Sequence, residues 1–288
     1  MIPGSFEYHR PASLSEAVAL LSQLDSDARV IAGGHSLIPM MKLRLAMPSH
    51  IVDLVGVPEL KGVHLDGSDI VIGAMTTQHE IIASELLAQH APILRETAEV
   101  IADPQVRYVG TIGGNVANGD PGNDMPALMM ALGASYVLNS ASGERRVAAR
   151  GYYLSTYETA AEPGEVLAAI RVPAPPKGHG WAYEKLKRKV GDYATAAAAV
   201  ILTVSNGAVA TCAIGLTNVA GTALFAADAA ALVIGTALDK PPLARAAAAA
   251  TAIAEPAADG RGSAEYRAKM AGVMTARALT RAFARAKS

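Results

Sequence analysis

The sequence predicts an α+β protein built of two domains. The chain has 288 residues, and at roughly 150 residues per domain this length favours two domains. Short strands and helices alternate in the first part, whereas longer alternating strands and an alanine-rich helical tail follow residue 177. Between the two parts, the prolines of PAPPKGHG (173–180) predict a stiff, extended connection. We therefore expect domains over 1–177, with subdomains of about 1–55 and 56–177, and over 178–288.

The first subdomain is predicted to contain two strand-and-helix pairs. A helix is expected over 13–24 (SLSEAVALLSQL), because its apolar residues recur at helical spacing and Ser13 or Ser15 can cap it. A short β-branched strand over 28–32 (ARVIA) ends at the pair Gly33-Gly34, and Ser36 then precedes a helical stretch, LIPMMKLRLA. Another strand is expected over 50–54 (HIVDL).

The second subdomain is predicted to mix strands and helices around one unusual segment. We expect a strand over 69–73, helices over 77–88 and 91–101, a helix over 126–133, and strands over 135–140, 145–149 and 165–173. Residues 103–126 have no sustained period and hold five glycines and three prolines. Because structureless loops of this length in compact domains are usually functional, we expect this segment to be a functional loop.

The second domain is predicted to be an antiparallel sheet with a few helices. The segments AYEKLKR (182–188), AAAVILTV (197–204) and VATCAIGLT (209–217) alternate as strands of a meander do. From Leu243 onward, alanine and arginine at helical spacing predict packed helices.

Composition and charge exclude several classes of protein. Hydrophobic residues make up 51% and charged residues 18%, so the chain can bury a sizeable core. The net charge is −1 and the basic string KLKRK (185–189) is short, which gives no electrostatic footprint for nucleic acid. The opening MIPGSFEYHRP has no apolar run behind a basic segment, and no apolar stretch reaches membrane-spanning length. We therefore expect a cytoplasmic protein without a transmembrane segment.

The residue types that commonly ligate metals are arranged unfavourably along the sequence. Cys212 is the single cysteine, so the chain can form neither an intrachain disulfide nor an iron–sulfur cluster of its own, and its apolar, alternating surroundings predict a buried strand thiol. The seven histidines show no HxxxH or HxH spacing. We expect no metal site and no catalytic residue in this chain.

Two glycine pairs predict a site for a phosphate group. The first, in Ala32-Gly33-Gly34-His35-Ser36, ends a strand and opens a helix, so its main-chain N–H groups can point outward toward an anion. The second, in Gly110-Thr111-Ile112-Gly113-Gly114-Asn115, lies within the segment 103–126. Neither matches the Walker or GxGxxG patterns. Two such bends can clamp one diphosphate, although either can also be only a tight turn.

The motifs AGGHS and DPQVRYVGTIGGN resemble those of the flavin subunits of the molybdenum hydroxylases, the group that includes xanthine and carbon monoxide dehydrogenases. The resemblance covers essentially the whole chain, including MIPGSFEYHRP, YEKLKRKVGDYATAAAAV and DGRGSAEYRAKMAGVM, and is greatest to the members that oxidise carbon monoxide. It implies a p-cresol methylhydroxylase-type FAD-binding domain of two subdomains, followed by a smaller C-terminal domain of antiparallel sheet and helices.

The resemblance also implies which residues bind FAD, non-covalently. In the first bend they are Ala32, Gly33, Gly34, His35, Ser36 and Leu37, and in the second Thr111, Ile112, Gly113, Gly114 and Asn115. Asp124 is implied as a partner of the polyol or adenosine portion, although on sequence alone it can equally be a helix cap before Pro126. Lys185 and the turn at 191–193, with Tyr193, are implied to close over the flavin ring. Tyr108 departs from the asparagine common in relatives, which leaves the contacts of that position open.

The function that the resemblance implies is electron transfer. FAD on this chain is expected to accept electrons from two [2Fe-2S] clusters of a small subunit and pass them to an external acceptor. A large subunit is expected to hold a molybdenum–copper cofactor, the subunits forming a dimer of heterotrimers that can sit peripherally at the inner membrane face. Three alternatives stay open: the flavin subunit of another molybdenum hydroxylase that oxidises an aldehyde, purine or other heterocycle, a stand-alone FAD oxidase, and a non-catalytic assembly protein.

Overall fold

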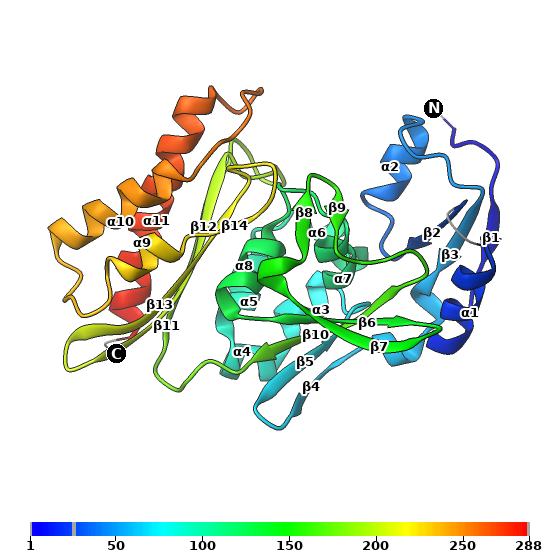
Figure 1. Cartoon of the computed structure of the whole chain (residues 1–288), viewed down its shortest axis with the longest axis horizontal. Helices are drawn as coiled ribbons and strands as arrows, with labels where there is room; N and C mark the ends of the chain where they lie inside the picture. The colour runs from blue at the N-terminus through cyan, green and yellow to red at the C-terminus, as the bar shows by residue number, and fades with distance from the viewer. Residues whose placement is uncertain (1, 25–26, 287–288) are drawn as a thin grey trace.

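The structure, a computed structural model, describes residues 2–24 and 27–286 and places them in three lobes side by side (Figure 1). The lobe nearest the N-terminus is a small parallel sheet with strand order β1-β3-β2. Its elements are β1 (Glu7–His9), α1 (Leu14–Leu24), β2 (Ala28–Ile31), α2 (Leu37–Lys42) and β3 (His50–Asp53). The predicted helix and both predicted strands are therefore present, and the Ser13 hydroxyl accepts the N–H of Glu16 at 3.2 Å as the expected cap.

The central lobe is an antiparallel sheet with order β4-β5-β10-β6-β7, covered by helices (Figure 1). Its strands are β4 (Val63–Asp66), β5 (Asp69–Gly73), β6 (Ser135–Ser140), β7 (Gly143–Ala148) and β10 (Val166–Pro173), with a ribbon of β8 (Tyr153–Ser155) and β9 (Glu158–Thr159). Its helices are α3 (Gln78–Ala83), α4 (Glu85–His90), α5 (Pro92–Glu99), α6 (Pro104–Val109), α7 (Ile112–Ala117) and α8 (Asp124–Leu132), with short 3-10 turns at Leu54–Gly56, Pro58–Leu60 and Ala149–Gly151.

Two expectations for this lobe need correction. The predicted single helix over 77–88 is two helices, because Ser84 leaves the helical conformation and its hydroxyl caps α4 by accepting the N–H of Leu87. The predicted structureless segment 103–126 contains α6 and α7 and also the start of α8. Both short helices are capped by side chains, since Asp103 accepts the N–H of Val106 and Thr111 that of Gly114. Helices of six residues are too short to show a clear period in the sequence.

The C-terminal lobe is the expected antiparallel meander with helices on one face (Figure 1). It consists of β11 (Gly180–Leu186), β12 (Ala196–Ser205), β13 (Ala208–Thr217), β14 (Leu224–Phe225), α9 (Ala227–Ala231), α10 (Lys240–Ala252) and α11 (Ala264–Ala286). Cys212 is partly buried on β13, where burial raises the pKa of its thiol to about 12. The thiol therefore stays protonated at neutral pH and carries no nucleophilic chemistry.

The central and C-terminal lobes pack closely through helix α8. All nine residues of α8 are buried, and a Cβ at Gly215 of β13 would overlap the carbonyl oxygen of Ala127. Glycine is needed at this position because the strand approaches the helix backbone directly. The packing fixes β11 and the turn after it relative to the central lobe. None of the helices in the described part of the chain combines the length and the apolar content that a membrane span requires.

Candidate cofactor site

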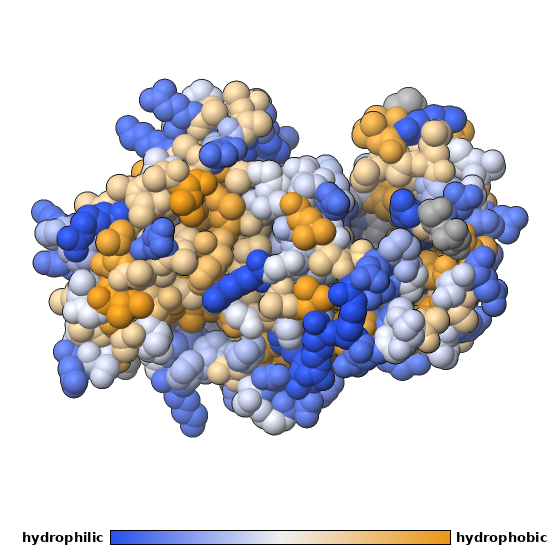
Figure 2. Space-filling model, in the orientation of Figure 1, coloured by the Kyte–Doolittle hydropathy of each residue, from blue (hydrophilic) through white to orange (hydrophobic). Residues whose placement is uncertain are grey.

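A cavity of about 670 Å³ lies where the three lobes meet. In Figure 2 the surface is hollowed between the α2 region and the central lobe. Thirteen of the fourteen residues that the sequence analysis singled out line this cavity: Ala32, Gly33, Gly34, His35, Ser36, Leu37, Thr111, Gly113, Gly114, Asn115, Asp124, Lys185 and Tyr193. The exception is Ile112, which is fully buried in the core of the central lobe behind the second bend. Ile112 therefore packs behind the bend and is not among the residues that line the cavity.

The first glycine bend presents unused main-chain donors. Gly34 has a φ of +73°, the left-handed conformation that glycine adopts most readily. None of the N–H groups of residues 33–37 donates to another described residue. Ser36, which precedes α2, makes no side-chain capping bond. A run of free N–H groups around a glycine turn can form a concave site for an anion.

The second glycine bend is arranged differently. The N–H groups of residues 112–115 are used within the protein: Ile112 donates to the carbonyl of Thr76 at 2.9 Å, Gly113 to that of Ala74 at 2.8 Å, Gly114 to the Thr111 hydroxyl at 3.0 Å, and Asn115 to the Thr111 carbonyl at 3.1 Å. These amides are not free to hold a diphosphate. The predicted clamp of a diphosphate by both bends stays a prediction, in which the free amides are those of residues 33–37.

The two bends touch each other. A Cβ at Gly33 would lie 2.5 Å from the carbonyl oxygen of Val109 and 2.8 Å from the Cα of Gly110. Such distances are far below van der Waals contact, so only glycine allows this approach. The two bends meet at one cavity, as the sequence predicted. Residues 33–37, with their free N–H groups, line one part of the cavity, and Gly113 and Gly114 of the second bend line another.

Asp124 and Lys185 form an ion pair in the wall of the cavity. The Asp124 carboxylate accepts from Lys185 Nζ at 2.7 Å, and both side chains are about 95% buried, with 5% and 3% of their surface exposed. The same carboxylate accepts from the Tyr183 hydroxyl at 2.5 Å. Burial, and then the negative charge of Asp124, raise the pKa of Tyr183 well above its usual value, so Tyr183 stays a donor. Asp124 is the first residue of α8, whose N-cap is Asn123, so its side chain is committed to this pair and does not cap the helix.

The turn between β11 and β12 carries Tyr193 to the mouth of the cavity. Gly191 in this turn has a φ of +83°. Tyr193 is 41% exposed, and its ring lies beside Gly122, close enough that a Cβ there would be 2.9 Å from Tyr193 Cδ1. Burial, and then the nearby Asp120, raise the pKa of the Tyr193 phenol, so it is neutral at physiological pH. An exposed aromatic face at a cavity mouth is suited to stacking on a planar ring.

Two polar residues of the cavity wall, Gln78 and Asn118, were not predicted from the sequence. The side-chain amide of Gln78 is 2% exposed, and neither its nitrogen nor its oxygen has a partner among the described residues. Asn118 Nδ2 is likewise buried without a partner. Buried amides are normally hydrogen-bonded, so unpaired ones that line a cavity indicate a polar ligand. No local sequence pattern identifies Gln78, because the segment at Thr77 meets Thr111 of the second bend only through the fold.

Tyr108, which departs from the family pattern, does not line the cavity. Its side chain is 59% exposed and its ring packs on His79 with centroids 4.0 Å apart.

Comparisons with known proteins agree with this architecture. The family model described as the FAD-binding domain in molybdopterin dehydrogenase matches residues 4–175, and that of the CO dehydrogenase flavoprotein C-terminal domain matches residues 181–282. The chain is 65% identical to the carbon monoxide dehydrogenase medium chain of Afipia carboxidovorans over 288 residues, all of both chains. It is 53% identical to the medium chain from Hydrogenophaga pseudoflava over 285 residues, 99% of each. The crystal structure of a cyanide-inactivated Cu,Mo-CO dehydrogenase aligns with a TM-score of 0.98 at 65% identity, covering 99% of this chain and 100% of that one.

Proposed function

The chain belongs to the FAD-binding subunits of the molybdopterin dehydrogenases, and from this premise we propose that it is the electron-transfer flavoprotein subunit of a molybdenum-containing carbon monoxide dehydrogenase. The observation that carries the proposal is the cavity in which a bend with free amides faces a second glycine bend. Full-length identities of 65% and 53% to carbon monoxide dehydrogenase medium chains favour carbon monoxide over an aldehyde or heterocycle as the substrate of the complex.

The cavity fits FAD in its chemistry. A diphosphate needs donors that carry no competing bond, and the N–H groups of residues 33–37 meet that need. Thr111 lines the cavity with a hydroxyl that accepts the Gly114 N–H and keeps its own hydrogen for a ligand. The unpaired amide of Gln78 offers both a donor and an acceptor to polar ligand atoms. When bound, FAD accepts electrons singly and releases them in pairs, which joins one-electron clusters to a two-electron acceptor.

The remaining residues position the cofactor and shield it. The Asp124–Lys185 pair holds β11 against the start of α8, so the cavity wall from the C-terminal lobe stays fixed relative to the bends. Tyr193 is proposed to cover the flavin ring and to control its access to solvent. No acid–base group is required of this chain, because the oxidation of carbon monoxide belongs to the molybdenum–copper site of the large subunit.

The proposed assembly has two further kinds of subunit. A small subunit supplies two [2Fe-2S] clusters and a large subunit the molybdenum–copper cofactor, arranged as a dimer of heterotrimers. Support for partners comes from the identity with a chain that is named as the medium one of several. Co-expression of the three subunits, followed by flavin and metal analysis and by assays with carbon monoxide, aldehydes and purines, tests this directly. Turnover of a purine or an aldehyde but not of carbon monoxide would show that the proposed substrate of the complex is wrong. The proposed electron-transfer role of this subunit would be unaffected.

The variant Gly114→Val tests the cofactor site. Gly114 is exposed in the cavity wall, and a Cβ there would lie 3.0 Å from the Thr111 hydroxyl and 3.7 Å from the Cβ of Ala32, so the two further carbons of valine are expected to enter the space between the bends. We expect FAD affinity to fall by at least about 100-fold, about 2.7 kcal/mol, measured from the flavin absorbance of the purified complex. Gly151→Val is the matched control, because nothing lies within 4 Å of a Cβ there and Gly151 is outside the cavity. Normal flavin content in Gly114→Val would contradict the proposed site.

The variant Tyr193→Ala tests the proposed cover of the flavin. FAD affinity should fall by only about 2- to 13-fold, since only stacking worth about 0.5–1.5 kcal/mol is lost. The rate at which external acceptors reoxidise the reduced flavin should change, as followed by stopped-flow absorbance. Unchanged flavin spectra and unchanged reoxidation rates would show that Tyr193 does not contact the flavin.

A further inference from the structure

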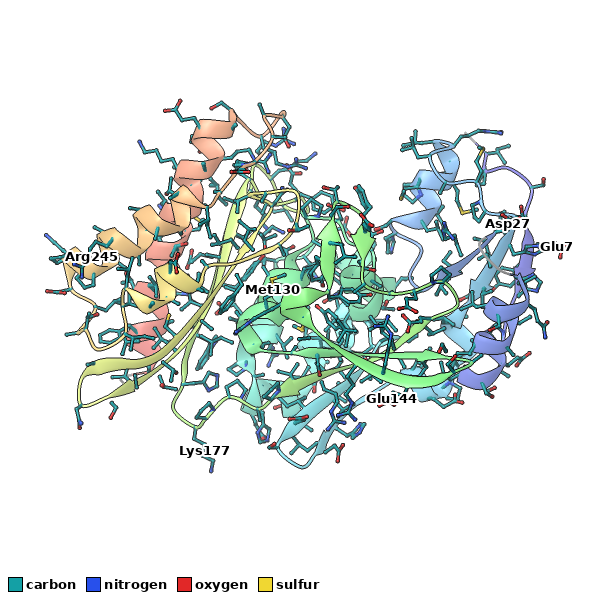
Figure 3. The ribbon with its side chains drawn as sticks, in the orientation of Figure 1. Glu7, Asp27, Met130, Glu144, Lys177 and Arg245 are labelled. Carbon is teal, nitrogen blue, oxygen red and sulfur yellow. The ribbon has the colours of Figure 1, made fainter. Side chains whose placement is uncertain are left out.

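Three side chains with metal-ligating atoms converge at the outer edge of the N-terminal sheet. Glu7 and His9 come from the edge strand β1, and His50 begins the neighbouring strand β3. The parallel register pairs Glu7 with His50, and since side chains two residues apart share a face, His9 joins them. The ligand atoms of the three residues all lie within 4.8 Å of one another. Glu7 stands at the far margin of this lobe (Figure 3).

The distances within this cluster suit one bound ion. His9 Nε2 lies 3.1 Å from His50 Nδ1, and His50 Nδ1 lies 3.5 Å from Glu7 Oε2. Two ligands at the Zn–N distance of about 2.0–2.1 Å and a tetrahedral angle are separated by about 3.3 Å. An ion can therefore replace the imidazole–imidazole hydrogen bond with little movement of either ring.

The three ligand atoms have no competing partners in the described part of the chain. His9 contacts His50, and His50 contacts Glu7; no other side-chain hydrogen bond to these three groups is formed by the described residues. The polar pair nearby, Tyr8 and Asp53, is bonded to itself at 2.5 Å. The imidazoles are partly buried and thus held in place, whereas the Glu7 side chain is 74% exposed and leaves the site open to solvent.

We propose that Glu7, His9 and His50 bind a divalent transition-metal ion of the zinc class, with water completing the coordination. Two imidazole nitrogens and one carboxylate are ligands that Zn²⁺, Cu²⁺ and Ni²⁺ prefer, whereas Mg²⁺ and Ca²⁺ require oxygen ligands throughout. With the ion bound, each neutral imidazole carries its proton on the other ring nitrogen, so both facing nitrogens offer a lone pair in place of the hydrogen bond between them. The bound ion ties the edge strand β1 to β3.

This site is independent of the cofactor cavity. Gly33 and Gly34 follow the carboxyl end of β2, whereas Glu7 and His50 stand at the amino ends of their parallel strands, and none of the three residues lines the cavity. The sequence predicted no zinc site because its histidines lack local spacing. Here the ligands come from strands 41 residues apart and meet only through sheet pairing.

Zinc titration of the full-length chain tests the proposal. After removal of metals with a chelator, isothermal titration with ZnCl₂ should show one site per chain that His9→Ala and His50→Ala each weaken by at least about tenfold. His64→Ala is the matched control, an exposed histidine on β4 that should leave the affinity unchanged. MgCl₂ should give no binding to this site. Absence of zinc binding in the wild type, or equal affinity in all three variants, overturns the proposal.

A spectroscopic readout identifies the ligands without relying on affinity. Electron paramagnetic resonance of the Cu²⁺-loaded chain should show hyperfine coupling to two imidazole nitrogens, and to one in His50→Ala. Glu7→Gln, at an exposed position that cannot unfold the chain, should weaken zinc binding while keeping both nitrogens. A spectrum with the same nitrogen coupling in wild type and His50→Ala contradicts the site. FAD content should be unchanged throughout, so failure here leaves the cofactor site standing.

Discussion

The two glycine bends share a sequence pattern, a glycine pair followed closely by a short polar residue. They differ in whether their main-chain N–H groups are bonded within the protein. In the bend over 32–37 the amides of residues 33–37 bond to nothing else in the described chain. In the bend over 110–115 the amides of residues 112–115 all bond within the protein, and a Cβ at Gly113 would lie 2.5 Å from that of Ala74. The difference favours a binding role for the first bend and a packing role for the second.

The difference follows from what lies behind each bend. The second bend packs against the segment that continues β5, so its amides find carbonyl partners at Ala74 and Thr76. The first bend projects from the carboxyl end of β2, where the cavity begins. In both places the glycine pair indicates that another group comes close to the backbone. The segments packed around the bend determine whether that group is a ligand or another part of the chain.

The largest expected effect comes from adding one carbon where the bends meet. In Gly33→Ala the new Cβ would lie 2.5 Å from the Val109 carbonyl oxygen, so the bends must separate and the free amides move. We expect FAD affinity to fall by at least about 100-fold, measured by flavin absorbance after reconstitution. Gly114→Ala is the matched change in the second bend, where the nearest atoms are 3.0 and 3.7 Å away, and it should cost at most about threefold. Equal losses in both would mean that the bends are not distinct in role.

An intermediate effect on stability is expected at the second bend. Thr111→Val removes the hydroxyl that accepts the Gly114 N–H and caps α7. We expect the free energy of unfolding to fall by about 1 kcal/mol, within the usual 0.5–2 for a lost cap, in urea denaturation of the FAD-free chain. A variant as stable as wild type would show that this bend does not need its cap.

The smallest effect on stability is expected at the equivalent position of the first bend. Ser36 precedes α2 but forms no side-chain capping bond, so Ser36→Ala should change the free energy of unfolding by less than about 0.5 kcal/mol. The same denaturation experiment measures it. If Ser36→Ala lowered the free energy of unfolding as much as Thr111→Val does, Ser36 would have a structural role. The two bends would then not differ in the way described here.

The sequence predicted helices and strands correctly where the hydrophobic pattern was long or where turn residues marked both of its ends. The helix over 13–24, the strand over 69–73 and the meander after residue 180 are present because each buries an alternating or helical face of several residues. Helices α6 and α7 were missed because each has six residues and depends on a side-chain cap. Resemblance to a family supplied the residues of the cavity wall, but it could not tell that Ile112 faces the core.

What the sequence could not supply is the use of each hydrogen-bonding group. Whether an amide is free depends on partners distant in the chain, such as the carbonyl of Ala74 beneath Gly113. The unpaired amide of Gln78 and the meeting of His9 with His50 arise in the same way, from pairing of segments that no local pattern connects. The sequence can thus identify candidate site residues. Whether each of them has a free hydrogen-bonding group depends on how the segments pack.

The most direct test of the central claim is a crystal structure of the FAD-loaded complex, in which the distances from the diphosphate oxygens to main-chain nitrogens are measured. The account predicts at least two such oxygens within about 2.7–3.2 Å of the N–H groups of residues 33–37 and no amide of residues 112–115 among the donors. A diphosphate held by the amides of residues 112–115, with those of 33–37 still free, would contradict it.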